Sequence, residues 1–526
     1  MIGRLVELGG FGLEAVVALT RNGLLAPVPP AALARIVEAY RHFHVTPAAG
    51  LAMAAARWPE RRAVVDEAGA ITFAELDARA AALAAGLHHR HGVGPGRTVA
   101  VMWPNDRGFP TAVAAVSRLD ADLLLLNTGL AGPRLRDVLR REDVDVLIAA
   151  PDLPSVDFDG PRVTDLDELA REDGPHGYDL DEAARESGPA VEPPRRAGRL
   201  VLLTSGTTGT PKGAPRRLSL TGLAEPFVSM LATVPLRSGE PMLIAPPLFH
   251  GLGLLWYAAA LVLGCPVVLL RRFDAEAVLD ALAAERAGAL VAVPIMLRRL
   301  LACPPRPLPH LRVVVSGGSA LPPDLAAAFM DAYGDVLYNL YGSTEAGWAS
   351  IATPADLRTA PGTVGRPPRG ATVRVAGPDG AEQPAGEVGR VLVAGGLTFT
   401  AAADGLLSTG DLGHRDGSGL LFIDGRDDDM IVSGGENVFP QEVEHLLARQ
   451  PGVADVAVLG VPDEEYGQRL AAYVVPEEGA APSADELRRA VKAELAGFKV
   501  PRDIEFVASV PRNQTGKVDR LRLRRR

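Results

Sequence analysis

The chain has very few lysines. Of its 54 basic residues only four are lysine, namely Lys212, Lys492, Lys499 and Lys517. Three of them, Lys212, Lys499 and Lys517, lie in glycine-bearing, loop-like segments, whereas Lys492 lies in the amphipathic stretch 484–495 and is expected on an ordinary helix surface. A compact ammonium group suits a phosphate oxygen better than a rigid guanidinium does. Compositional bias alone is the competing interpretation, but the three loop lysines are candidates for contacts with phosphate or carboxylate.

The chain also lacks a basic surplus and has little cysteine. A net charge of −10 argues against nucleic acid as the main partner, because that binding needs a positive face. The two cysteines, Cys265 and Cys303, show no CxxC spacing, which predicts a reducing, cytoplasmic location and no zinc site.

Uninterrupted apolar runs long enough to cross a membrane are missing as well. Residues 241–270 carry no Asp, Glu, Lys or Arg, but prolines and glycines divide them into a loop, a helix of about a dozen residues and a short strand. Glu7 and Glu14 interrupt the apolar N-terminal stretch 1–25, so it is expected to be neither a signal peptide nor a spanning helix. Its apolar face is expected to pack on the protein, and peripheral membrane contact through it stays open as an alternative.

The sequence pattern is typical of an α/β protein of more than one domain. A chain of 526 residues exceeds what one core usually supports. The helical pattern at 73–90 alternates with short β-branched runs at 98–103, 145–150 and 200–204, which predicts a large α/β domain. Short glycine-punctuated strands follow at about 360–424 and predict a small barrel or sheet. The last hundred residues, with their own strands and helices, predict a second domain.

The segment 204–213 has the composition of a phosphate-binding loop. Its glycines let backbone N–H groups converge, and five hydroxyl side chains and Lys212 surround them. It is not a Walker A motif, because Pro211 stands where that motif needs glycine before lysine.

This loop is followed in order by YGSTE (341–345), STGD (408–411), GRDDDMIVSGGENVFPQEVE (425–444) and PRNQTGK (511–517). Together these motifs resemble the signatures of the adenylate-forming (AMP-binding) superfamily, most closely the fatty-acyl-CoA synthetases. The resemblance implies a large N-terminal α/β domain with stacked sheets and a barrel-like subdomain (1–425), followed by a small, mobile α+β domain (426–526). It also implies an acid–thiol ligase that forms acyl-AMP and then the thioester. Its reactants would include ATP and coenzyme A, and Mg²⁺ would be its cofactor.

The resemblance assigns a role to each motif. In the nucleotide site, Glu345 would bind Mg²⁺, Thr344 the α-phosphate, and Asp411 and Arg426 the ribose, and Lys517 would stabilise the adenylation transition state. The remaining nucleotide-binding residues implied are Thr204, Ser205, Gly206, Thr207, Thr208, Gly209 and Lys212 for the phosphates, and Gly317, Gly318, Ser319, Tyr341 and Gly342 for adenine. Outside that site, Asp428 would be the hinge, Ser433, Gly434 and Gly435 would approach coenzyme A, and Lys499 would lie near the nucleotide or coenzyme A phosphates.

The segment 246–261 resembles the acyl-pocket element of fatty-acyl and aryl-CoA ligases. It places His250 and Gly251 in the pocket, and Val293 and Met296 are expected to line the same region. Amino-acid-activating relatives usually carry an Asp at this motif, and none occurs here, so an uncharged, fatty acid is expected. Loading of a carrier-protein thiol and aryl-CoA ligation stay open, as do two roles of His250, a gate and a core histidine. Between Gly395 and Ser408 the chain lacks the longer aromatic-bearing stretch of many relatives.

Overall fold

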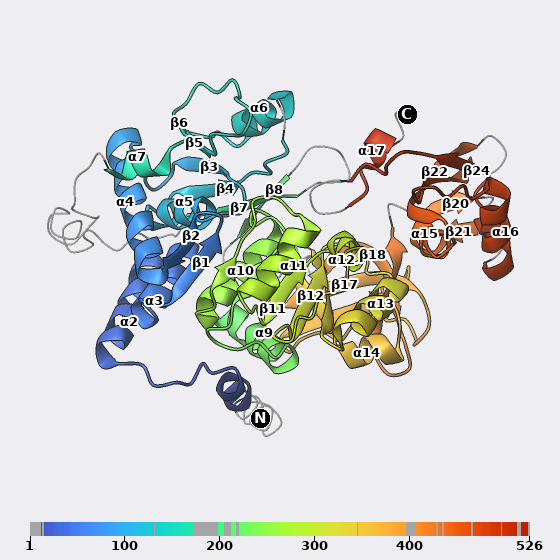
Figure 1. Cartoon of the computed structure of the whole chain (residues 1–526), viewed down its shortest axis with the longest axis horizontal. Coiled ribbons are helices and arrows are strands. Elements are labelled where there is room, and N and C mark those ends of the chain that lie inside the picture. The colour runs from blue at the N-terminus through green and yellow to red at the C-terminus, as the bar shows by residue number, and fades with distance from the viewer. Residues whose placement is uncertain are drawn as a thin grey trace.

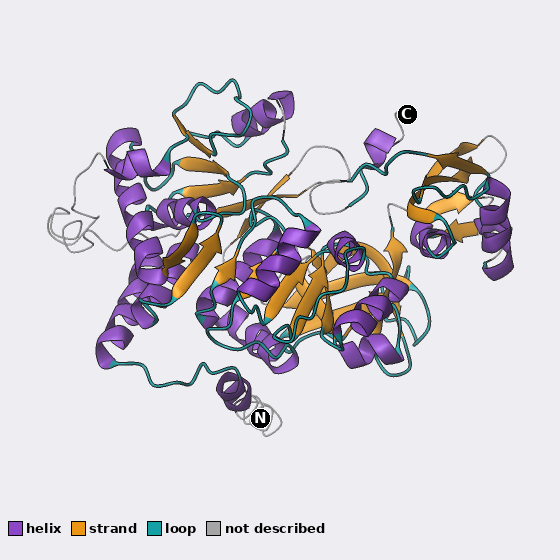
Figure 2. Cartoon of the chain, viewed as in Figure 1, coloured by secondary structure: helices purple, strands orange, loops and turns teal. Residues whose placement is uncertain are grey.

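The computed structural model describes residue 12 and residues 15–130, 132–171, 198–204, 212–216, 220–343, 346–395, 405–427, 430–433, 436–463, 467–495, 497–512 and 517–523. Two large sheets with helices around them form the body of the molecule, and a smaller sheet-and-helix unit made by the C-terminal residues lies to one side (Figures 1 and 2). The predicted α/β class, with a large N-terminal part and a small C-terminal part, is confirmed.

The larger sheet has eight strands. In spatial order they are β14 (Gly347–Ala352), β13 (Leu337–Ser343), β12 (Val313–Gly317), β11 (Ala289–Ala292), β9 (Met242–Ile244), β10 (Val267–Val268), β1 (Arg62–Asp66) and β2 (Gly69–Thr72). The interior pairs are parallel and the two edge pairs are antiparallel. Strands such as β11 and β12 are buried along their whole length, as parallel strands covered on both faces are.

The second sheet has six strands, in the order β6 (Arg162–Val163), β5 (Val146–Ala149), β3 (Thr98–Met102), β4 (Asp122–Leu125), β7 (Leu200–Thr204) and β8 (Lys212–Arg216). Only β7 and β8 pair antiparallel. The segment 151–199, rich in Asp, Glu, Pro and Gly, contributes β6 and helix α7 (Leu166–Arg171) among its described residues.

Helices cover both sheets. α4 (Phe73–His91) begins where Thr72 and Glu75 form a capping box and ends where Gly92 adopts a left-handed conformation at φ 60°. Strands and helices of both sheets share one hydrophobic core that includes Phe73, Phe109 and Trp256. The other helices of this part are α2 (Pro30–Phe43), α3 (Pro47–Arg57), α5 (Gly108–Arg118), α6 (Gly132–Arg141), α9 (Leu220–Thr233), α10 (Gly251–Leu263), α11 (Ala275–Ala284), α12 (Pro294–Leu301), α13 (Pro323–Tyr333) and α14 (Pro354–Thr359). No helix in the described part of the chain is both long and apolar enough to cross a membrane.

The glycine-punctuated region forms an open sheet. Its five antiparallel strands are β15 (Thr363–Gly365), β19 (Leu421–Arg426), β18 (Leu407–Arg415), β17 (Gly389–Gly395) and β16 (Ala371–Ala376), in that order. Within the described ranges β15 and β16 are the two edges and do not pair with each other, so the expected barrel-like closure is not found.

The C-terminal unit has its own core. A sheet of β21 (Glu436–Val438), β20 (Ile431–Ser433), β23 (Gly467–Pro476), β22 (Val453–Asp463) and β24 (Asp503–Phe506) packs on α15 (Pro440–Ala448) and α16 (Ala484–Glu494). A short 3₁₀ helix (Gly497–Lys499) and α17 (Arg520–Leu523) complete it. Polar contacts between described residues join it to the larger part. Arg449 lies 3.4 Å from the carboxylate of Asp324 at the start of α13, and Arg298 donates to the carbonyl of Ala454 at 3.4 Å.

Candidate active site

The parallel strands of the eight-stranded sheet bring several sequence motifs to one edge. The segment 245–250 follows β9, and Val293 follows β11. Gly317 ends β12 and Gly318 follows it, and Tyr341 lies near the end of β13. The carboxyl ends of parallel strands meet at the same sheet edge, where α/β proteins bind ligands. A cavity of about 2030 Å³ lies there, and His250, Gly318, Ser319, Tyr341, Gly342 and Asp411 are among its wall residues.

A polar cluster in this cavity joins two sheets. The hydroxyl of Tyr341 donates to Asp411 Oδ2 at 2.5 Å, and Arg426 Nη1 lies 3.3 Å from Asp411 Oδ1. Asp411 and Arg426 are direct cross-strand partners on β18 and β19, so the sheet register sets this pair. Thr409 Oγ1 accepts from the backbone N–H of Asp411 at 3.1 Å, across Gly410 within β18, where Gly410 has φ 76°.

Burial and hydrogen bonding act in opposite directions on the pKa of the Asp411 carboxyl group. Asp411 is only 13% exposed, and burial raises its pKa, while the bond from Tyr341 and the charge of Arg426 oppose the rise. Burial, the Asp411 charge and the bond to Asp411 raise the pKa of Tyr341. The cluster therefore presents a neutral phenol and a carboxylate with an arginine beside it, a set that can accept and donate hydrogen bonds at a sugar.

At two positions of the predicted site, the backbone conformation or a close neighbour requires glycine. Gly318 has φ 81°, the left-handed region that side chains disfavour. A Cβ on Gly342 would lie 2.0 Å from the carbonyl oxygen of Gly347 on the neighbouring strand, so only glycine fits beside the bulge between β13 and β14. Gly317 ends β12 and is buried, and Gly318 and Ser319 form the cavity wall.

The C-terminal unit reaches the same cavity. Lys517, Arg512 and Glu444 are among the wall residues. Lys517 lines the same cavity as His250 and Asp411, and its positive charge lowers the pKa of both side chains. Glu444 accepts from the backbone N–H of Val458 at 2.8 Å, and burial raises its pKa to about 7. Lys517, 176 residues after Tyr341, thus faces the same space.

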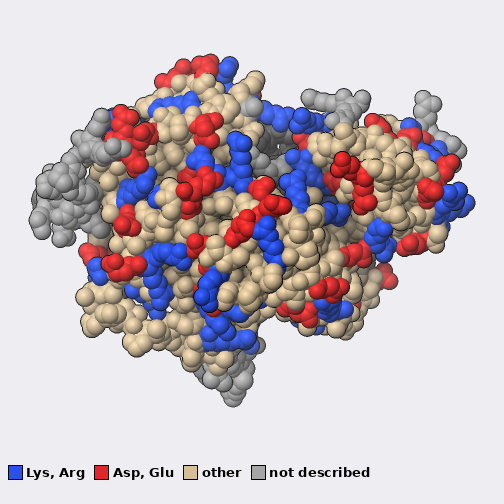
Figure 3. All heavy atoms as spheres, in the orientation of Figure 1, with Lys and Arg blue, Asp and Glu red and all other residues tan. Residues whose placement is uncertain are grey.

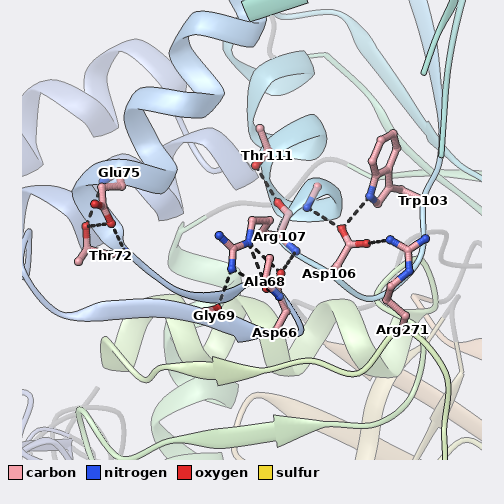
Figure 4. A network of polar contacts seen from close by, with 11 residues as sticks. Asp66, Ala68, Gly69, Thr72, Glu75, Trp103, Asp106, Arg107, Thr111 and Arg271 are labelled. Atoms are coloured by element: carbon pink, nitrogen blue, oxygen red, sulfur yellow. Dashed lines mark hydrogen bonds and ion pairs between the residues drawn. The ribbon is translucent and has the colours of Figure 1, made fainter. Parts of the chain in front are cut away.

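The segment before His250 is held by a residue that the sequence did not single out. Asn105 is 5% exposed, donates to the carbonyl of Pro246 at 2.9 Å and accepts from the backbone N–H of Leu248 at 2.8 Å. The turn that carries Asn105 is itself braced on both sides (Figure 4). Asp106 accepts from Trp103 at 2.8 Å and pairs with Arg271, and Arg107 pairs with Asp66. The side-chain amide therefore clamps the chain that leads into His250.

Replacing Asn105 by alanine should weaken binding of the acid more than binding of ATP. The change leaves the carbonyl of Pro246 and the N–H of Leu248 without their partner, which costs about 1–3 kcal/mol for each unsatisfied buried group. We expect the KM for the acid to rise about tenfold, with a smaller change in the KM for ATP. For Asn105→Asp, which keeps one acceptor, we expect a KM for the acid between those of the wild type and Asn105→Ala. Unfolding midpoints would show that the variants fold, and an unchanged KM for the acid would contradict the clamp.

His250 is held in its neutral form. It stands at the N-terminal cap position of α10, and burial, followed by the charge of Lys517, lowers its pKa to about 4. It lines the cavity, which favours the gate interpretation over a core histidine.

The same shift predicts a pH dependence of stability. Between about pH 6.5 and 4 the unfolded chain binds a proton at His250 and the folded chain does not, so stability falls as the pH falls through this window. At pH 5 this difference in proton binding lowers the free energy of unfolding by about 1–2 kcal/mol. His250→Gln should therefore lose less thermal stability than the wild type between pH 7 and pH 5. His310→Gln, at an exposed histidine, is the control and should behave as the wild type does. Equal losses in all three proteins would contradict the buried neutral histidine.

Two residues expected in the acyl pocket are buried beside the cavity. Val293 and Met296 are 2% and 6% exposed and belong to the main core, whereas Ile295 and Arg298 of α12 line the cavity. The expected role of Val293 and Met296 in the acyl pocket stays a prediction.

Lys499, expected near the nucleotide or coenzyme A phosphates, pairs with a carboxylate. Its ammonium group lies 2.7 Å from Glu442 of α15, inside the C-terminal unit. It is not among the described residues that line the cavity, so in this arrangement of the two units it serves local structure.

Several predicted site residues lie outside the described part of the chain. These are Ser205, Gly206, Thr207, Thr208, Gly209, Thr344, Glu345, Asp428, Gly434 and Gly435. Thr204 and Lys212 lie at paired backbone positions of β7 and β8, and Ser433 ends β20. Among the described residues, no group of three or more His, Cys, Asp or Glu side chains could hold a metal ion.

Comparison with known proteins agrees with this geometry. The family model of the AMP-binding enzymes matches residues 51–401, and that of the AMP-binding enzyme C-terminal domain matches residues 442–517. The chain is 35% identical over 498 residues to a feruloyl-CoA synthase of Amycolatopsis sp., covering 89% of this chain and 98% of that protein. It is 30% identical over 458 residues to the long-chain-fatty-acid–CoA ligase FadD13 of Mycobacterium tuberculosis, covering 82% and 88%.

A solved structure shares the fold over nearly the whole length. It is o-succinylbenzoate CoA synthetase (MenE) from Bacillus subtilis in complex with the acyl-adenylate intermediate OSB-AMP. The TM-score is 0.78 at 28% identity, with 90% of this chain and 97% of that chain covered. The chain therefore belongs to the AMP-binding, adenylate-forming enzyme family, as an AMP-forming acid–thiol ligase of the acyl- and aryl-CoA ligase type.

Proposed function

We propose that this enzyme activates an apolar, fatty carboxylic acid as acyl-AMP and then forms its coenzyme A thioester. The observation that carries the proposal is one continuous cavity. It holds the Tyr341–Asp411–Arg426 cluster at one wall, Lys517 from the C-terminal unit at another, and the apolar face of α10 beyond His250. Reactants of both kinds, a nucleotide and an apolar acid, can therefore meet in the same space.

The polar cluster suits the sugar of ATP. A carboxylate with two acceptor oxygens matches the two hydroxyls of a ribose, and Asp411 is the buried carboxylate of the cavity wall nearest Tyr341. Arg426 would hold the carboxylate in its charged form and reach the same sugar. The Tyr341 ring, with Gly318 and Ser319 opposite it in the wall, would receive the adenine. The 204–212 segment would hold the β- and γ-phosphates.

In the first half-reaction a carboxylate oxygen of the acid attacks the α-phosphorus of ATP, and the bond to pyrophosphate breaks. Negative charge grows on the oxygens around that phosphorus, and a fixed cation beside it lowers the barrier. We assign this role to Lys517, which lines the same cavity as His250 and Asp411. Thr344 would hydrogen-bond the α-phosphate, and Mg²⁺ held by Glu345 would neutralise phosphate charge, as oxygen-rich sites for this ion do.

In the second half-reaction the sulfur of coenzyme A attacks the acyl carbon and AMP leaves. We infer that the 426–526 domain turns about Asp428 between the two steps. The turn would withdraw Lys517 and bring the segment Ser433, Gly434 and Gly435 toward the thiol. Arg449 with Asp324, an exposed ion pair, and Arg298 with Ala454, a single 3.4 Å hydrogen bond, are contacts between the units that such a motion can break.

The cavity wall formed by α10 near His250 has no charged side chain, which favours an acid whose chain is uncharged. The cavity-lining positions of α10 are glycine, alanine and other apolar residues, and none carries an acidic group that would pair a substrate amine. A fatty acid fits this wall more simply than an amino acid does.

The proposal is tested by AMP release from Mg-ATP with a panel of straight-chain, aromatic and amino acids, with and without coenzyme A. We expect AMP release that needs both an apolar acid and coenzyme A. Release that needs a phosphopantetheinyl carrier protein in place of coenzyme A would make the chain a carrier-loading ligase. Release with aromatic acids alone would make it an aryl-CoA ligase. No release with any acid would overturn the proposal.

A further inference from the structure

Lys517 lies beside a pair of backbone contacts that join two stretches of the C-terminal chain. The N–H of Asp519 donates to the carbonyl of Pro511 at 2.8 Å, and Arg512 and Val518 form an antiparallel bridge. Lys517 is the residue before Val518, so the backbone beneath its side chain is held against Arg512. A lysine side chain is a flexible stem with a compact charge, so a fixed backbone is needed to aim its ammonium group at one phosphorus.

A carboxylate of the C-terminal sheet holds Arg512 in turn. The Nη2 group of Arg512 donates to Asp455 Oδ1 at 2.7 Å, and its Nε group donates to Asp455 Oδ2 at 3.1 Å. Two parallel hydrogen bonds between a guanidinium and a carboxylate fix orientation as well as position. Both side chains are only 24% exposed, so solvent and salt screen this pair less than an open surface pair. The ion pair therefore ties the chain beside Lys517 to the sheet.

Asp455 also lies next to a contact with the larger part. The register of β22 against β23 shifts just before Asp455, at a bulge that includes Ala454. The carbonyl of Ala454 accepts from Arg298 of α12 at 3.4 Å. The contact with the larger part and the carboxylate that holds Arg512 are therefore one residue apart, which links the place of Lys517 to the docked position of the C-terminal unit.

Several basic side chains lie where the two units meet. Figure 3 shows basic side chains gathered between the C-terminal unit, at the right, and the body of the molecule. Arg298, Arg512 and Lys517 all line the cavity. Like charges that share a cavity repel each other unless a carboxylate or a phosphate neutralises them. Asp455 neutralises Arg512, which weakens the repulsion between Arg512 and Lys517.

We propose that Asp455 and Arg512 are positioning residues for Lys517 in the adenylation step. The inference rests on the proposed function, because it takes Lys517 as the cation beside the phosphorus under attack. Asp455 holds the guanidinium of Arg512, and the bridge between Arg512 and Val518 holds the chain next to Lys517. A misplacement of about 1 Å costs a catalytic group about a hundredfold in rate, so a pair that acts only through Lys517 has a large effect on the first half-reaction. The second half-reaction, for which Lys517 is withdrawn, does not need the pair.

The test measures both half-reactions in Asp455→Asn and in Arg512→Lys, which loses the planar fork. We expect acid-dependent pyrophosphate release to slow about tenfold or more in each variant, while the KM for ATP and the attack of coenzyme A on supplied acyl-AMP change little. Asp455→Glu, which keeps the carboxylate, should recover part of the rate. Asp503→Asn is the matched control and should leave both half-reactions unchanged, because Asp503 pairs with Arg469 at 2.8 Å in the same sheet and is not among the described residues that line the cavity.

A double variant separates positioning from a direct or merely structural role. In the Lys517→Ala background, Asp455→Asn should cause no further loss, because the group that it positions is already absent. A further loss of the same size in that background, equal slowing of both half-reactions, or a wild-type rate in Asp455→Asn would each overturn the proposal. Val510 and Leu523 belong with Leu459 to a separate apolar cluster, so we expect the variants to fold, which unfolding midpoints would check. Pyrophosphate release at the wild-type rate in Lys517→Ala would instead remove the role of Lys517 on which the inference rests.

Discussion

Lys517→Ala is expected to lower acid-dependent pyrophosphate release by about two to three orders of magnitude, the usual cost of removing one fixed group that stabilises transition-state charge. Lys517 shares the cavity with Tyr341, Asp411 and His250. Attack of coenzyme A on supplied acyl-AMP should change little, because the proposed second step does not use this lysine.

The chain offers a matched control in Lys492→Ala. Lys492 is exposed on α16 and should tolerate the same change with both half-reactions intact. If Lys517→Ala slowed both half-reactions equally, the assignment of this lysine to adenylation alone would fail. If Lys517→Ala slowed neither half-reaction, Lys517 would not be a catalytic residue.

Asp411→Asn is expected to raise the KM for ATP about ten- to a hundredfold, because a hydrogen bond to a charged group is worth about 1.5–3 kcal/mol. Asparagine keeps the shape and can still accept from Tyr341, which now bonds Asp411 at 2.5 Å. It removes the charge that pairs with Arg426 at 3.3 Å and one acceptor for the sugar. The KM for the acid should change less than the KM for ATP.

Asp379→Asn is the control for this variant. Asp379 lies in the turn between β16 and β17 of the same sheet, accepts from the backbone N–H of Ala381 at 3.0 Å, and is not among the described residues that line the cavity. An asparagine can make the same turn contact, so no kinetic change is expected. A KM for ATP that stayed at the wild-type value in Asp411→Asn would contradict the ribose assignment.

Local pattern predicted the elements well where the chain itself marks their ends. The expected helix at 73–90 is α4, bounded by the Thr72 capping box and Gly92, and the expected strand at 200–204 is β7. The helix between the glycines of the 241–270 stretch is α10, which ends where Gly264 is left-handed at φ 59°. Capping and glycine chemistry act within a few residues, so a single sequence reports them.

Contacts between distant segments were not predictable in the same way. The Asn105 clamp joins residues more than 140 positions apart, and a buried asparagine has no periodicity that marks it. The ordered motifs did indicate Tyr341, Asp411 and Arg426, but the sheet register that pairs the last two came only from the fold. The sequence also did not show that Ile295 and Arg298 of α12 line the cavity while Met296 is buried in the core. The open sheet in place of a barrel likewise depends on which distant edges pair.

The central claim is that one cavity brings ATP and an apolar acid together for adenylation before any thiol is present. The most direct measurement is a rapid-quench assay of pyrophosphate with excess Mg-ATP and a sixteen-carbon acid, without coenzyme A. We expect a burst of close to one pyrophosphate per enzyme chain, with acyl-AMP retained and AMP released only when coenzyme A is added. Pyrophosphate that forms without the acid, or that appears only after coenzyme A is added, would contradict it.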